Sequence, residues 1–154
     1  MIKQSGFSLL ELIIVVAIMA LLVGVALWTV GGFQRAAQLE ATETLVINVL
    51  EKAKAQTLNS THRTNYGVYF ETNRLVLFAG LDYDEAEETN QEYLLPANLI
   101  MTADFEGNQA VVFERLTGRP LVAGQVVIQV ETDPDQERII VVSPAGRIGS
   151  VINP

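Results

Sequence analysis

The longest apolar run of the chain is residues 7–30, which read FSLLELIIVVAIMALLVGVALWTV and contain one charged side chain, that of Glu11. At about 1.5 Å per residue, a helix over this run is about 36 Å long, comparable with the roughly 30 Å hydrocarbon core of a bilayer. The run therefore predicts a helix that spans a membrane. Lys3 precedes it, and a cationic start favours an orientation with the N-terminus inside and the C-terminus outside.

Glu11 has two open interpretations. A carboxylate costs about 2.5–3.5 kcal/mol at the centre of a bilayer and less near an interface. Glu11 either lies at the depth of the lipid headgroups, exposed and without a specific role, or pairs with a cation that another subunit supplies. Its position in the sequence does not separate the two.

A secretory signal peptide is a competing interpretation of the same run. Gly24, Val25 and Ala26 form a small-x-small pattern of the kind that signal peptidase cuts after an apolar segment. Two features weigh against it, because the carboxylate of Glu11 falls inside the apolar segment and apolar residues continue past the proposed cut to Val30.

The N-terminal string has a specific resemblance. Residues 3–11 read KQSGFSLLE, with a short basic leader that ends in Gly6, an aromatic Phe7, and Glu11 at the fifth position after the junction. This resembles the processing signal of type IV prepilins and type II secretion pseudopilins. The resemblance implies that a membrane prepilin peptidase cleaves between Gly6 and Phe7 and methylates the new amino group of Phe7. It also implies that Glu11 offsets the N-terminal amine of a neighbouring subunit and so sets the stagger between subunits.

The resemblance also implies a domain organisation and a location. Residues 1–6 are expected to be the leader peptide, residues 7–31 a transmembrane and filament-core helix, and residues 32–154 a periplasmic or extracellular pilin-like globular domain. The expected partners are other pilin or pseudopilin subunits, the prepilin peptidase and an inner-membrane assembly platform. The chain would pass once through the cytoplasmic membrane and then enter an extracytoplasmic filament, and no cofactor is implied.

The remaining sequence predicts an α+β fold. After Gly31 and Gly32 the pattern becomes amphipathic, and this segment and the apolar run are expected to form one long helix or to be separated by a bend at the glycine pair. Its apolar face is predicted to consist of Phe33, Ala37, Ala41, Leu45, Val49, Leu50, Ala53 and Leu58. Strands follow, so the fold expected is a long N-terminal helix, transmembrane in its first half, packed on an antiparallel β-sheet.

The strands are expected in pairs. Residues 66–70 and 75–78 flank ETNR and predict a hairpin, and residues 99–105 and 110–113 flank EGN as a second pair. Further strands are predicted at residues 126–131, 138–142 and 147–152, with turns at residues 133–136 and 143–146.

Shorter strings favour a minor subunit. The segments AKAQTLNS before YGVYF, VVFERLTGRP, and IIVVSPAGRIG near the C-terminus are similar to the H-type minor pseudopilins and their pilus counterparts, the GspH/FimT group. This likeness rests on short, degenerate strings and leaves a major pilin open. It also leaves open whether the filament belongs to a pilus or to a secretion system.

Composition and motifs exclude most enzymes. The 154 residues include no cysteine, which excludes disulfides, thiolate metal sites and thiol catalysis. The only histidine, His62, has no sequence motif that supplies a catalytic triad or a zinc site, and no glycine-rich phosphate loop occurs. We therefore assign no catalytic residue and expect a protein that is not an enzyme.

Two charged segments have competing interpretations. Six acidic residues lie within residues 82–92, either as a calcium loop or as a solvated acidic loop, but the spacing of an EF-hand fails at Glu87, so no metal ligand is assigned. Arg147 lies in AGRIG, where some minor pilins of this group contact DNA. A net charge of −8 disfavours phosphate binding, so we expect Arg147 to flank a turn.

Two rival functions follow from these alternatives. One is a minor pilin that takes up DNA, and the other is a domain that is anchored by one span or secreted and has no role in a filament.

Overall fold

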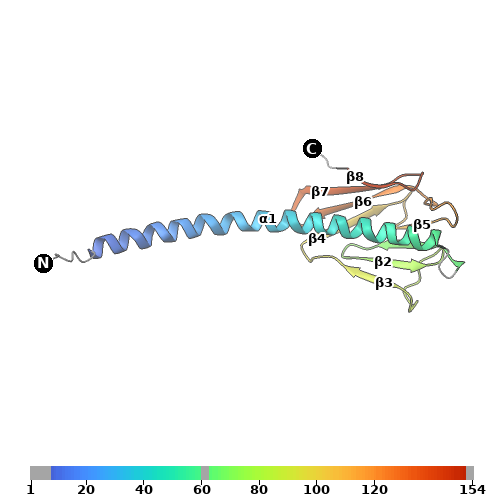
Figure 1. Cartoon of the computed structure of the whole chain (residues 1–154), viewed down its shortest axis with the longest axis horizontal. Helices are drawn as coiled ribbons and strands as arrows, with labels where there is room; N and C mark the ends of the chain where they lie inside the picture. Colours follow the sequence, from blue (N-terminus) through green and yellow to red (C-terminus); the bar gives the residue numbers. More distant parts are fainter. Residues whose placement is uncertain (1–7, 60–62, 152–154) are drawn as a thin grey trace. The chain divides into compact units, whose positions relative to one another are not determined.

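The computed structural model describes residues 8–59 and 63–151, with residues 25–33 described by their backbone only. In these described residues, the helix α1 (Leu9–Leu58) is followed by β-strands, as predicted (Figure 1). The helix is continuous in its backbone through Gly31 and Gly32, so the two predicted helical segments are one. The chain divides into two compact units, Met1–Ala36 and Ala37–Pro154.

The strands form two antiparallel sheets instead of the single sheet predicted. One sheet has the order β3-β2-β1-β5 and the other the order β4-β6-β7-β8. The bounds of the strands are β1 (Tyr66–Phe70), β2 (Arg74–Ala79), β3 (Gln91–Leu94), β4 (Leu99–Asp104), β5 (Ala110–Phe113), β6 (Gly124–Val130), β7 (Asp133–Val142) and β8 (Ile148–Val151).

One face of the second part of α1 is buried. The buried side chains follow the helical period of three or four residues and are Leu39, Thr42, Val46, Val49, Leu50, Ala53 and Thr57. The apolar ones among them form one hydrophobic cluster with residues of both sheets, including Phe70 of β1 and Ile128 of β6.

Part of the predicted helix face is therefore wrong. Val49, Leu50 and Ala53 are buried as expected, but Ala37 and Ala41 are exposed. Each lies two residues from Leu39, which is about 200° around a helix, so they face away from the sheets. Leu58 is also largely exposed, because it is at the last turn of α1, and the side chain of Phe33 lies outside the described residues.

The β1–β2 hairpin is confirmed, with Phe70 opposite Leu75. The pairing predicted between residues 99–105 and 110–113 is wrong, because β4 pairs with β6 and β5 pairs with β1. The turn itself exists, since Glu106 and Gly107 both have positive φ and Phe105 bridges to Asn108. After this single bridge the chain crosses from one sheet to the other, and the ring of Phe105 stacks on that of Phe70 at 5.8 Å between centroids.

Two further details differ from the prediction. The turn after β6 is at Glu131 and Thr132, and Asp133 already pairs with Val130 in β7. Residues 134–136 are instead looped out of the register, because Gln129 pairs with Glu137. The edge strand β3 was not predicted, since its residues are mostly exposed and carry no alternating apolar pattern.

The end of α1 is tied to β1 by a buried hydroxyl. The Thr57 hydroxyl donates to the carbonyl of Ala53 at 2.9 Å and accepts from the amide of Tyr66 at 2.9 Å. Thr57 is fully buried, so this hydrogen bond forms away from water.

We expect Thr57→Val to lower the free energy of unfolding by about 1–3 kcal/mol, because the buried amide of Tyr66 loses this acceptor while the volume of the side chain is nearly kept. Thermal unfolding of the full chain in detergent, followed by circular dichroism, measures the change. The matched control is Thr44→Val, at an exposed position of the same helix. Equal stability of the two variants would contradict the assignment of this contact.

Candidate functional site

The first turn of α1 is capped by Ser8. Its hydroxyl accepts a hydrogen bond from the amide of Leu10 at 3.3 Å, and its carbonyl accepts from the amide of Leu12 at 3.2 Å. Glu11 is three residues beyond Ser8, in the first turn, where the positive end of the helix dipole favours a carboxylate. The side chain of Glu11 is exposed.

The helix beyond Glu11 exposes apolar side chains in every direction. The large apolar residues from Leu9 to Val23 have exposed fractions between 41% and 76%, and they occupy most positions of this segment, so they surround the helix. A helix that is apolar all round is normally covered by protein or lipid. This segment with Glu11 is therefore the candidate assembly site.

The structure describes only some of the other residues predicted for this region. Gly6 and Phe7, the predicted cleavage and methylation residues, lie outside the described residues, as does His62. The alternative signal-peptide site at residues 24–26 is inside the continuous α1. In the described part of the chain, no helix is long and apolar enough to cross a membrane.

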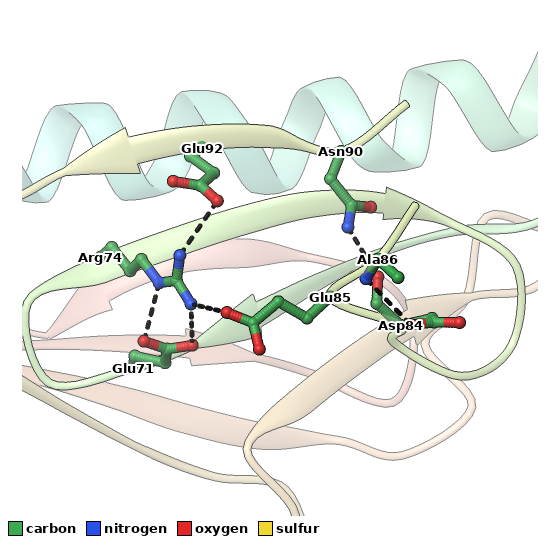
Figure 2. A network of polar contacts seen from close by, with 7 residues as sticks. All are labelled: Glu71, Arg74, Asp84, Glu85, Ala86, Asn90 and Glu92. Carbon is green, nitrogen blue, oxygen red and sulfur yellow. Dashed lines mark hydrogen bonds and ion pairs between the residues drawn. The ribbon is translucent and has the colours of Figure 1, made fainter. Parts of the chain in front are cut away.

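The acidic loop is organised around Arg74, the first residue of β2. The guanidinium donates to both carboxylate oxygens of Glu71 at 2.7 and 2.8 Å, and to Glu85 at 3.1 Å and Glu92 at 3.0 Å (Figure 2). Glu71 lies in the turn between β1 and β2, Glu85 belongs to the loop and Glu92 to β3. One cation thus joins three segments.

The loop also packs on the sheet through an aromatic side chain. The ring of Tyr83 stacks on that of Tyr69 at 4.2 Å between centroids and meets the edge of Phe78 at 5.7 Å. Removal of the Tyr83 hydroxyl from water raises the pKa of this phenol above its ordinary value. The loop is therefore folded and packs on one face of the β3-β2-β1-β5 sheet.

Three carboxylates of the loop have partners from the chain itself. Besides Glu85 and Glu92, the carboxylate of Asp84 accepts from the amide of Ala86 at 2.9 Å, and its carbonyl accepts from the Asn90 side chain at 2.7 Å (Figure 2). Among residues 8–59 and 63–151, no group of three His, Cys, Asp or Glu side chains is placed to hold a metal ion.

Arg147 lies at the β7–β8 turn, as expected. Its carbonyl accepts from the amide of Ser143 at 2.9 Å, and its amide donates to the Ser143 hydroxyl at 3.0 Å. The side chain of Arg147 is exposed.

Arg74 was not singled out from the sequence. The one local signal is its spacing of three residues from Glu71 across the hairpin. Its contacts with Glu85 and Glu92 depend on the pairing of β2 with β3, which the sequence did not predict.

Residues 1–27 match the family model of the prokaryotic N-terminal methylation motif. No curated protein matches the chain. The motif indicates a membrane-anchored N-terminus.

The fold is similar to two solved proteins. One is the type IV minor pilin FimU of Pseudomonas aeruginosa in two crystal forms, with TM-scores of 0.60 at 14% and 16% identity, covering 74% and 76% of this chain and 93% and 90% of FimU. The other is the minor pseudopilin EpsH from the Type 2 Secretion System of Vibrio cholerae, with a TM-score of 0.57 at 13% identity, covering 74% of this chain and 96% of EpsH.

A long N-terminal helix that begins in a methylation motif and then packs on antiparallel sheets is the architecture of a pilin-like protein. The chain thus combines a methylation motif at its N-terminus with a fold similar to those of a minor pilin and a minor pseudopilin.

We expect Arg74→Ala to release the loop of residues 81–92 and to lower the protection of its amides from hydrogen exchange several-fold.

We expect low pH to lower the protection of the same amides. The hydrogen bonds from Arg74 lower the pKa of Glu71 below its ordinary 4.5. This stabilisation is complete above pH 4.5 and is lost as the pH falls through the lower value of the folded chain.

The control is Arg147→Ala, which removes an exposed arginine far from the loop in sequence. We expect it to leave protection of the loop unchanged. A loop that stays protected in Arg74→Ala would show that Tyr83 alone holds it.

Proposed function

We propose that this chain is a structural subunit, a minor pilin or pseudopilin, of a type IV pilus or type II secretion filament, and that it acts by assembly instead of catalysis. The observation that carries the proposal is the apolar surface that surrounds α1 from Leu9 to Val23 beside one carboxylate. Burial of apolar surface contributes about 25 cal/mol per Å², so a helix that exposes so much of it is stabilised strongly by lipid or by other subunits.

The same proposal includes processing and location. A prepilin peptidase cleaves between Gly6 and Phe7 and methylates the amine of Phe7, which divides the chain into a leader of residues 1–6, a core helix of residues 7–31 and a globular domain of residues 32–154. The match of residues 1–27 to the methylation motif supports this. Before assembly the chain is held in the cytoplasmic membrane with its N-terminus inside, and an assembly platform then transfers it to the filament.

Glu11 then acts as the acidic partner of an N-terminal amine from a neighbouring subunit. Either charge alone is costly in an apolar filament core, whereas the pair attracts strongly at a low effective dielectric constant. Glu11 is the only charged residue between Phe7 and Val30, so only one stagger between neighbours pairs the charges.

We expect mass spectrometry of the mature chain, expressed with a prepilin peptidase, to find methylated Phe7 as the first residue. Gly6→Val should prevent cleavage, because a branched side chain keeps the backbone away from the peptidase. The control Ser5→Ala should still be processed. A mature chain that begins at Leu27 would support secretion through a signal peptide instead.

We expect Glu11→Ala to leave processing intact and to reduce incorporation into filaments by at least tenfold, because loss of one member of a buried ion pair costs about 3–5 kcal/mol. The measurement is the amount of subunit in sheared filaments relative to that in membranes. The control is Glu40→Ala, at an exposed acidic position later on α1. Normal filament levels of Glu11→Ala would count against the register role.

A further inference from the structure

The globular unit has a hollow of about 270 Å³ where the last turns of α1 face the β1–β2 hairpin and the residues that lead into β3. An apolar cavity of about 150 Å³ already holds a benzene ring, so this hollow has room for one aromatic side chain. The residues that line it include Gln56 of α1, Tyr66 of β1, Leu77 and Ala79 of β2, and Thr89 and Gln91 where β3 begins.

The hollow exists because β3 covers only part of β2. The pairing of the two strands ends at Leu77 with Gln91, so β3 does not pair with Ala79. The amide of Gly80 donates to the carbonyl of Asn65, on the β1 side, at 2.9 Å. Backbone groups of an antiparallel strand alternate in direction, so the N–H and C=O of Ala79 point to the other side, which β3 leaves uncovered.

Gln56 adds a side-chain acceptor to the wall of the hollow. The side chain is half-buried, and its amide oxygen is shielded from water. No hydrogen-bond partner for this oxygen occurs within residues 8–59 and 63–151. A buried acceptor without a partner is destabilising, and the last torsion of a glutamine side chain is soft. The oxygen can therefore turn to a donor that enters the hollow.

The wall that contains Thr89 and Gln91 is held by hydrogen bonds within the chain. The Asn90 side chain donates to the carbonyl of Asp84 at 2.7 Å, which fixes the loop next to Thr89. The Lys52 ammonium donates to the amide oxygen of Gln91 at 2.7 Å, which ties the start of β3 to α1. Such a wall is ordered before a partner arrives, so binding costs little further ordering.

We propose that this hollow takes up a tyrosine side chain from a neighbouring filament subunit of a different kind. The ring lies beside Leu77, and the hydroxyl donates to the amide oxygen of Gln56 and accepts from the amide of Ala79. A tyrosine hydroxyl can do both, whereas the indole of tryptophan only donates. Buried aromatic side chains are common anchors of protein–protein contacts.

The partner is a different chain for a structural reason. Among residues 8–59 and 63–151, no aromatic side chain described is exposed, so the described part of a second copy offers no such anchor. A contact of this kind joins two different chains once, which suits a minor subunit. The inference rests on the proposed function, because the partner is another subunit of the filament.

The site is tested with p-cresol, the side-chain analogue of tyrosine, and with toluene, which lacks the hydroxyl. Each is titrated into the full chain at one detergent concentration, and NMR follows the amides of Ala79 and Thr89. We expect saturable shifts with p-cresol and several-fold weaker binding of toluene. Gln56→Leu should weaken p-cresol several-fold and leave toluene unchanged. The matched control is Gln34→Leu, at an exposed position of α1, which should bind both probes as the natural chain does.

The partner is tested in assembled filaments. The photoreactive amino acid p-benzoylphenylalanine replaces Glu88, which is exposed and next to Thr89, and the filaments are irradiated. We expect a cross-link to a tyrosine-containing peptide of another filament subunit, and its loss when that tyrosine is replaced by alanine.

Three results would overturn the proposal: equal binding of p-cresol and toluene, tighter binding of indole than of p-cresol, or no cross-link to another kind of filament subunit. Mass spectrometry of the N-terminus keeps the hypotheses apart. Methylated Phe7 in a chain that enters filaments, together with any of these results, refutes the tyrosine site alone and not the proposed function.

Discussion

The burial of one stripe of α1, from Leu39 to Thr57, holds the globular unit together. Its side chains form one cluster with residues of both sheets, and the stacked rings of Phe70 and Phe105 join the sheets inside that cluster. Because the chain has no disulfide, this packing and the hydrogen bonds around it supply the stability of the unit. The ion pair between Glu43 and Arg138, at 3.2 Å, adds a polar tie between α1 and β7.

The first part of the same helix needs cover on every side. From Leu9 to Val23 the apolar side chains are exposed in every direction, so packing of one face alone would not bury them. In the function proposed above, lipid and then neighbouring subunits provide that cover. In the same proposed function, pairing of the single carboxylate with one partner charge converts a general apolar attraction into a defined register.

The cations of the globular unit differ in exposure and in contacts. Arg74 is turned inward to three carboxylates and fixes the acidic loop, and its side chain is only 20% exposed. Arg63, Arg119 and Arg147, by contrast, are exposed.

The sequence by itself determined the N-terminal motif, the apolar run with Glu11, the order of one helix before strands, and the β1–β2 hairpin. These features depend on neighbouring residues, because periodicity and turn chemistry act over a few positions. Only the tertiary structure decided that β4 and β5 belong to different sheets, that β3 covers the edge of β2, and that Ala41 faces outward. Such features depend on contacts between residues far apart in the chain, whose pairing is chosen by the packing of the whole core.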